Sequence, residues 1–136
     1  MKLAILKVAK GLLSAIYWVM KLFPQDKNRI VFLSRQGDSP GRDFTLLADQ
    51  LHKDMPNFKT VMLCRRFVAK ESGLVGKIGY IFHVLRQTWH IARTRVALQD
   101  TYCIPISLLK HRNNLLVIQL WHSIGCMKMT GYAILD

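Results

Sequence analysis

Residues 29–41 read RIVFLSRQGDSPG, and the pattern in this stretch is the main evidence for the fold class. Arg29–Leu33 is short and rich in β-branched and aromatic residues, which predicts a buried strand. Ser34–Gly41 is polar and contains proline and glycine, so we expect a turn directly after the strand. Apolar residues at helical spacing follow over Phe44–His52, and Asp43 stands where a helix cap is expected. The stretch and its continuation therefore predict a strand–turn–helix unit.

The same alternation continues to the end of the chain. Strands are expected at residues 59–64, 96–98 and 115–120, with a long helix at 74–93 and one or two helical turns at 105–110. The run at 115–120 is apolar throughout, which is typical of a central parallel strand buried on both faces. Strands that alternate with helices predict an α/β fold with an open, Rossmann-like parallel sheet.

Composition limits the class of protein. The 136 residues correspond to one domain or part of one, and 51 % hydrophobic residues exclude a disordered chain. A net charge of +12 favours an anionic partner such as nucleic acid, an acidic membrane surface or a phosphate-rich substrate. The sequence contains no P-loop, GxGxxG, RNA-binding or helix-turn-helix signature. Nucleic acid is therefore not expected as a partner, and it stays an alternative based on charge alone.

Cysteine and histidine spacing indicates neither a metal site nor a cofactor. Cys64, Cys103 and Cys126 lie far apart, which favours reduced thiols over a disulfide framework or zinc ribbon. His83 and His90 share a helix face without a third ligand, so packing is the simpler interpretation. Cys126 lies four residues after His122, but no third group is evident that would orient a Cys–His pair.

The N-terminal segment, residues 1–23, is predicted to be a membrane-associating amphipathic helix. Its polar residues are spaced three and four apart and form one stripe, consisting of Lys7, Lys10, Ser14, Tyr17 and Lys21. Three lysines oppose a membrane span, and no small-residue cleavage site supports a signal peptide. Tyr17 and Trp18 suit a membrane boundary, with the lysines on anionic headgroups. The alternative is a helix that packs against a part of the protein outside this sequence.

Pro24 ends this helix, residues 24–28 form a linker, and residues 29–136 form the α/β domain. Three polar clusters follow predicted strand ends: Ser34-Arg35-Gln36, Asp100-Thr101-Tyr102 and Trp121-His122-Ser123. The carboxyl ends of parallel strands share one edge of a sheet, so these clusters are expected to form one site. His122 is either a general base there or a hydrogen-bonded core histidine. A helix starting at Ser123, with Lys128, would attract phosphate.

Val117–Asp136 reads VIQLWHSIGCMKMTGYAILD and resembles the CDP-glycerol glycerophosphotransferases, which build teichoic-acid-type polymers. The matching positions are Gln119, Trp121, His122, Gly125, Lys128, Gly131 and Tyr132, whereas Ser123 replaces the family's usual Ala or Gly. Two further stretches also resemble the family, at residues 30–36 with Asp43-Phe44, and at 98–103 before Leu109-Lys110-His111.

The resemblance implies the N-terminal, acceptor-side half of a GT-B architecture. It implies that His122 is the base that deprotonates a lipid-linked polyol-phosphate acceptor, which then attacks CDP-glycerol and releases CMP. Substrate-binding positions would be Ser34, Arg35, Asp100, Trp121, Ser123, Gly125 and Lys128.

The enzyme would lie peripherally on the cytoplasmic face of the cell membrane. Its donor-binding half would lie beyond Asp136, so this chain alone is expected to be inactive. The alternative is a non-catalytic module that binds the membrane surface.

Overall fold

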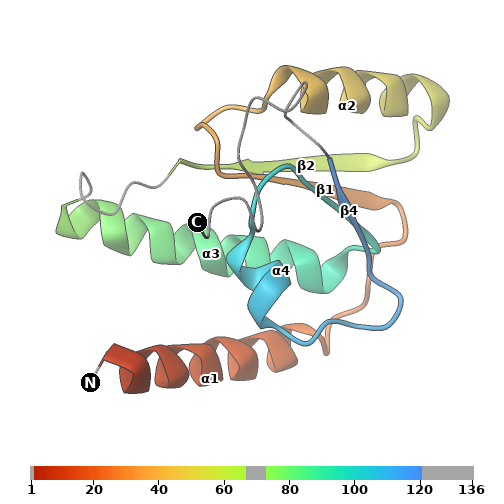
Figure 1. Cartoon of the computed structure of the whole chain (residues 1–136). Helices are drawn as coiled ribbons and strands as arrows, with labels where there is room; N and C mark the ends of the chain where they lie inside the picture. Colours follow the sequence, from red (N-terminus) through yellow and green to blue (C-terminus); the bar gives the residue numbers. More distant parts are fainter. Residues whose placement is uncertain (1, 67–72, 121–136) are drawn as a thin grey trace, which may run out of the picture.

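The computed structural model describes residues 2–66 and 73–120 (Figure 1). Helices and strands alternate along the described chain. In order, the elements are α1 (Lys2–Met20), β1 (Arg29–Ser34), α2 (Arg42–Asp54), β2 (Lys59–Cys64), α3 (Leu74–Arg93), β3 (Val96–Gln99), α4 (Ile104–Leu108) and β4 (Leu116–Gln119).

The four strands form one parallel sheet in the order β2-β1-β3-β4. Val31 of β1 lies opposite Val61 of β2 on one side and Ala97 of β3 on the other. The chain leaves β1 toward β2 through α2, and α3 then carries it back past β1 to β3. The strand order therefore reverses between β1 and β3, which is the switch point where open α/β sheets bind ligands. This topology is Rossmann-like and confirms the predicted α/β class.

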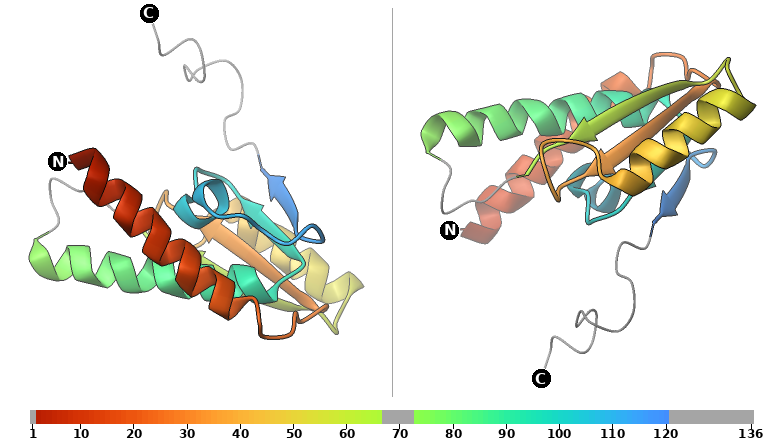
Figure 2. Two further views of the ribbon diagram at one scale, coloured as in Figure 1. Left: turned by 90° about the horizontal axis from the view of Figure 1, so that it is seen from below. Right: turned by 90° about the horizontal axis from the view of Figure 1, so that it is seen from above.

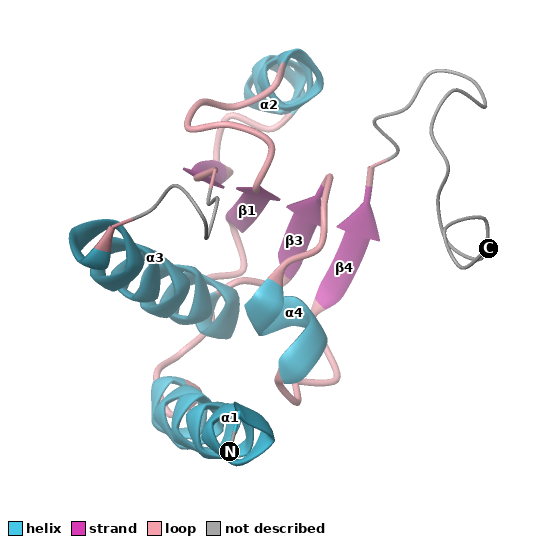
Figure 3. Ribbon diagram, turned by 60° about the vertical axis from the view of Figure 1, so that its left-hand side comes forward, coloured by secondary structure: helices cyan, strands magenta, loops and turns pink. Residues whose placement is uncertain are grey.

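Helices cover both faces of the sheet (Figure 3). On one face α2 buries Phe44 and Ala48 against Ile30, Phe32 and Leu98. On the other face α3 and α4 pack on Val31, Leu33, Leu63 and Ala97. The alternation of strand side chains between the two faces explains why neighbouring residues of β1 enter different cores.

Helix α1 lies outside α3 and forms a further layer (Figure 2). The Tyr17 hydroxyl lies 2.8 Å from Nδ1 of His111, and Nε2 of His111 lies 2.9 Å from the Ile106 carbonyl oxygen. Because that carbonyl can only accept, Nε2 donates and Nδ1 accepts from Tyr17. Lys21 Nζ also donates to the Lys110 carbonyl. These bonds attach the end of α1 to the segment before β4.

The burial of Tyr17 corrects one sequence prediction. Its side chain is 2 % exposed, so it packs into the protein and does not lie on an outer surface with Trp18, which is 63 % exposed. Burial raises the Tyr17 pKa to about 12, although Arg112 opposes that shift. No helix among residues 2–66 and 73–120 has the length and hydropathy to cross a membrane.

Most element boundaries follow the sequence pattern, and three details differ. Helix α2 begins at Arg42 after an extended Gly41, so Asp43 lies inside the first turn and is not the cap. Helix α4 covers Ile104–Leu108 and starts with the proline at its second position. The helical turns expected at residues 105–110 thus begin one residue earlier and end two residues sooner.

Strand β4 was predicted to be central and buried on both faces, and this is wrong for the part of the chain that the structure describes. Within that part β4 pairs with β3 alone, and all four of its residues are exposed. An apolar run indicates that a strand tends to be buried, but it carries no information about how many strands lie beside it.

Candidate functional site

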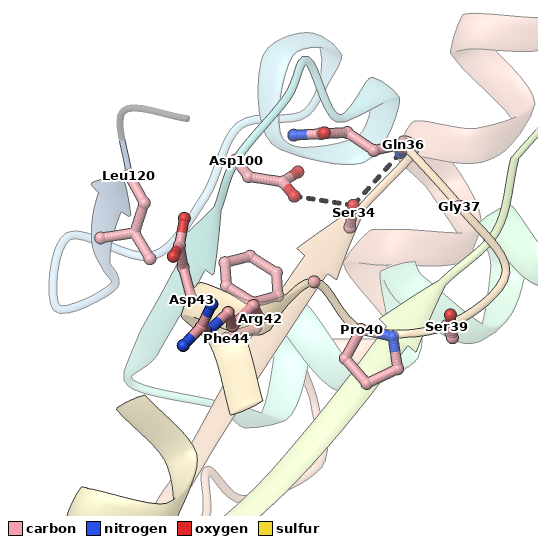
Figure 4. A pocket seen from close by; sticks show the side chains of 11 residues that line it. Ser34, Gln36, Gly37, Ser39, Pro40, Arg42, Asp43, Phe44, Asp100 and Leu120 are labelled. Atoms are coloured by element: carbon pink, nitrogen blue, oxygen red, sulfur yellow. Dashed lines mark hydrogen bonds between the residues drawn. The ribbon is translucent and has the colours of Figure 1, made fainter. Parts of the chain in front are cut away.

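The candidate site lies at the switch point between β1 and β3. Ser34 is the last residue of β1, and Asp100 directly follows β3. The Ser34 hydroxyl donates to Oδ2 of Asp100 at 2.8 Å (Figure 4). The structure therefore brings two of the predicted substrate-binding residues together from positions 66 residues apart.

Hydrogen bonds hold the Asp100 carboxylate in one orientation. Thr101 Oγ1 donates to Oδ1 at 2.9 Å, and the Gln36 N–H donates to Ser34 Oγ at 3.2 Å. Asp100 is 7 % exposed, and the ion pair formed within the described ranges joins Arg29 to Asp26 instead. An ionised carboxylate offers about four acceptor positions, and hydroxyl groups occupy two of them. Asp100 can therefore accept further hydrogen bonds from a hydroxyl-bearing substrate.

A cavity of about 330 Å³ opens beside this pair. Its wall is the loop between β1 and α2 together with the first turn of α2, from Gln36 to Phe44, and Leu120 closes it on the other side (Figure 4). Arg42 and the amide groups at the start of α2 favour a negatively charged group at this wall, whereas the carboxylates of Asp43 and Asp100, which also line the cavity, oppose one and suit hydroxyl donors. Polyol hydroxyls at Asp100 and a phosphate at the start of α2 would fit one cavity.

The contribution of α2 to the cavity was not predicted from the sequence. Arg42 and Asp43 both line the cavity, whereas Asp43 was assigned to capping. The signal available was the spacing of Gly37, Pro40 and Gly41 between a strand and a helix, which indicates a loop at the carboxyl edge of the sheet.

Arg35 lies away from the cavity wall, although it follows Ser34 directly. Neighbouring residues of an extended chain point to opposite faces of the sheet. The Arg35 guanidinium carbon consequently lies 5.9 Å from the ring centre of Tyr80 on α3. The Arg35 N–H still donates to Thr101 Oγ1 at 3.1 Å, which ties the two strand ends together. Burial raises the pKa of Tyr80.

The third predicted cluster falls outside the described residues. The predicted site residues of this segment are Trp121, His122, Ser123, Gly125 and Lys128. The Cys126–His122 spacing also lies outside the described residues. Leu120 is the last described residue; it lines the cavity, and its N–H donates to the Gln99 carbonyl at 2.7 Å.

The histidines of α3 and the cysteines in the described ranges are partly or fully buried, and their shifted pKa values do not favour catalysis. Burial lowers the pKa values of His83 and His90, which favours neutral imidazoles. Burial also raises the pKa of the Cys64 thiol and brings that of Cys103 to about 11, so neither is an activated nucleophile. No group of three or more metal-binding side chains occurs among residues 2–66 and 73–120.

A parallel α/β sheet with a polar cavity at its switch point defines a class of proteins that bind small polar ligands there. The family described as CDP-Glycerol:Poly(glycerophosphate) glycerophosphotransferase matches residues 15–136, and the chain belongs to this family.

Two relatives come from Bacillus spizizenii (strain ATCC 23059 / NRRL B-14472 / W23). The chain is 29 % identical to a teichoic acid ribitol-phosphate primase over 100 % of its own length and 34 % of the relative's. It is 26 % identical to a teichoic acid poly(ribitol-phosphate) polymerase over 93 % of its own length and 19 % of the relative's. The chain thus spans about a third and about a fifth of these proteins.

Proposed function

We propose that the protein containing this chain transfers glycerol phosphate from CDP-glycerol to a lipid-linked, teichoic-acid-type polyol-phosphate acceptor and releases CMP. The observation that carries the proposal is the Ser34–Asp100 pair beside a cavity at the switch point, in a chain of this family. Asp100 would accept hydrogen bonds from acceptor hydroxyls, and the start of α2 with Arg42 would bind the neighbouring phosphate.

His122 is the proposed general base. It lies two residues after Leu120, which lines the cavity, and the family resemblance gives it this role. The imidazole takes the proton of a terminal acceptor hydroxyl, and that oxygen forms a bond to the β-phosphorus of CDP-glycerol. The bond from the β-phosphorus to the CMP oxygen breaks at the same time, so CMP leaves with the electron pair. Positioning and charge stabilisation supply most of the rate acceleration in such reactions.

The chain would form the acceptor-side half of a GT-B enzyme. Support comes from the Rossmann-like sheet and from relatives about three and five times as long. The donor-binding half, with the rest of the CDP-glycerol site, would belong to a following domain. On this proposal the 136-residue chain by itself releases no CMP.

The enzyme would work as a peripheral protein on the cytoplasmic face of the membrane. Large apolar side chains are exposed along α1 and the turn after it, namely Ile5, Leu6, Val8, Leu12, Trp18, Val19 and Leu22. Lys7 and Lys10 are exposed on the same helix, as in helices that lie on anionic lipid. Lys21, which was also predicted to face the membrane, instead donates to the Lys110 carbonyl and lies over the buried Tyr17 ring. The exposed apolar surface also favours a second candidate function, in which the chain is a membrane-surface module without catalysis.

Vesicle sedimentation tests the membrane part. Replacing Lys7 and Lys10 by glutamate should weaken binding to vesicles of anionic phospholipid, since each basic residue near such a surface contributes roughly 1 kcal/mol. Lys53→Glu on α2, across the sheet from α1, is the control and should bind like the wild type. Equal binding of all variants, or binding that salt does not affect, would refute a membrane-facing α1.

CMP release from CDP-glycerol tests the catalytic part in the native protein. His122→Ala should abolish release in the presence of a polyol-phosphate acceptor, whereas His52→Ala, at an exposed position of α2, should leave it unchanged. Unchanged release in His122→Ala would remove that residue from the mechanism. Vesicle binding by a native protein that releases no CMP would favour the non-catalytic module.

A further inference from the structure

Arg35 and Arg65 form an arginine pair at the edge of the sheet, on the face opposite the candidate cavity. Arg35 directly follows β1 and Arg65 directly follows β2, and the Arg65 N–H donates to the Ser34 carbonyl at 3.1 Å. Because side chains of an extended chain alternate, both arginines share the face of Leu33 and Leu63, which α3 covers. Both are half-buried there, so two positive charges stand side by side on neighbouring strands.

Helix α3 forms the base of the arginine pair. Nη1 of Arg65 donates to the Gly79 carbonyl at 2.9 Å, and the guanidinium carbon of Arg35 lies 5.9 Å from the centre of the Tyr80 ring. A Cβ atom at position 79 would lie 2.9 Å from Nη2 of Arg65, so a larger residue would displace that guanidinium. Glycine at this position therefore lets the arginine lie directly against the helix backbone.

The described residues provide no counter-ion for the pair. The ion pair within residues 2–66 and 73–120 joins Arg29 to Asp26. Nε of Arg35 is buried without a hydrogen-bond partner in that part of the chain, and so is Nε2 of His83, which lies one turn after Tyr80 on α3. Adjacent like charges repel each other, and buried polar atoms without partners are costly. An anion bound at the pair would reduce both costs.

The surroundings of His83 are also positively charged. Its ring centre lies 6.2 Å from that of Tyr80. Burial lowers the pKa of His83, the charges of Arg65 and Arg86 lower it further, and the Asp38 carboxylate opposes the shift. Oδ1 of Asp38 already accepts the next backbone N–H after Arg65 at 3.0 Å. Two arginines thus stand against one carboxylate that is partly engaged elsewhere.

We propose that Arg35 and Arg65, together with Nε2 of His83, bind a phosphate group. Guanidinium groups match phosphate oxygens in pairs, and two of them with an imidazole offer more donors than a single carboxylate can accept. The expected source is a phosphodiester of the acceptor, because a chain of polyol phosphates can reach both the cavity and the arginine pair around the end of β1. The source rests on the proposed function, whereas the site itself does not.

Titration of the full 136-residue chain with inorganic phosphate, followed by NMR of the His83 imidazole, tests the site. Phosphate should move the His83 resonance, which is assigned by its loss in His83→Gln. It should also raise the pH at which His83 titrates, because a bound anion favours the imidazolium form. Arg35→Gln and Arg65→Gln should each weaken phosphate binding roughly tenfold, the loss of one charge-assisted hydrogen bond. Arg66→Gln, at the exposed next arginine, and Arg42→Gln, at the cavity, should leave this titration unchanged.

Gly79→Ala repeats the test without removing a charge. The added methyl group displaces the Arg65 guanidinium and should weaken phosphate binding roughly tenfold, as Arg65→Gln does. Alanine is a better helix former than glycine, so this variant keeps the fold. Gly73→Ala, where no atom lies within 4 Å of the added methyl group, is the matched control and should bind phosphate like the wild type.

A His83 resonance that phosphate does not move, or equal affinity in the wild type and all variants, would refute the site. Equal affinity for acetate would refute the assignment to phosphate. Glycerophosphoglycerol, a phosphodiester, should move the same resonance and lose affinity in the same variants, and binding of inorganic phosphate alone would overturn the acceptor as the source. CMP release does not enter these titrations, so failure of the arginine pair is distinguishable from failure of the proposed function.

Discussion

Replacing Ser34 by alanine removes one hydroxyl and affects two hydrogen bonds at the candidate site. The Asp100 carboxylate loses its 2.8 Å donor, and the Gln36 N–H loses its acceptor at 3.2 Å. The removed hydroxyl lies at a position that is only 2 % exposed, so water replaces it poorly as a donor to that carboxylate oxygen. A hydrogen bond to a charged group contributes about 1.5–3 kcal/mol. We therefore expect Ser34→Ala to lower the free energy of unfolding by about 2 kcal/mol, or roughly 8 °C in Tm for a domain of this size.

Urea and thermal unfolding followed by circular dichroism measure this loss. Ser39→Ala, at an exposed serine of the same loop, is the matched control and should stay within about 0.5 kcal/mol of the wild type. Asp100→Asn keeps the shape and removes the charge, so in that background Ser34→Ala should cost only about 1 kcal/mol. A Ser34→Ala protein as stable as the Ser39→Ala control would contradict the argument that Ser34 holds a buried carboxylate.

Three further predictions concern the packing around the site. Burial raises the pKa of Tyr17 to about 12, so its contribution to stability is complete below about pH 10, the unfolded value, and is lost as the pH rises toward 12. Tyr17→Phe should remove the highest-pH step in the ultraviolet titration of tyrosine, and an unchanged titration would refute the assignment. Cys103, whose pKa burial raises to about 11, should resist alkylation near neutral pH until urea unfolds the chain, and peptide mass spectrometry that finds it modified as fast as free cysteine would contradict its burial. Phe44→Ala should cost about 3–5 kcal/mol of unfolding free energy, because it removes a buried ring whose centre lies 5.1 Å from that of Phe32. Leu46→Ala on the exposed side of α2 should cost little, and equal costs for the two variants would refute the packing of α2.

Local sequence pattern determined the elements and the edge of the sheet at which the site lies. Ile30–Leu33 and residues 59–64 are strands because β-branched and apolar side chains pack well on a pleated sheet. Alternation of strands and helices predicts parallel strands whose carboxyl ends share one edge, since parallel strands need a crossover connection. Ser34 and Asp100 could therefore be expected at one edge before their hydrogen bond was known. The strand order β2-β1-β3-β4, and with it the switch point, came from the structure.

Tertiary surroundings determined what the pattern could not predict. Leu116–Gln119 is as apolar as β1, yet its exposure depends on the strands beside it and not on its own residues. Tyr17 lies on the polar stripe of α1, but the partner that buries it is His111, 94 residues away. Ser34 and Arg35 were grouped together as neighbours in the chain, and the alternation of an extended backbone separates their side chains.

The kinetics of CMP release by the native protein, measured against acceptor concentration in wild type and Asp100→Asn, test whether the acceptor binds at the switch point between β1 and β3. Asp100→Asn should raise KM for the polyol-phosphate acceptor about tenfold or more, the loss of one hydrogen bond to a charged group. KM for CDP-glycerol should stay near the wild-type value, and Asp49→Asn on the exposed surface of α2 should change neither. A wild-type acceptor KM in a folded Asp100→Asn protein would contradict the placement of the acceptor site between β1 and β3.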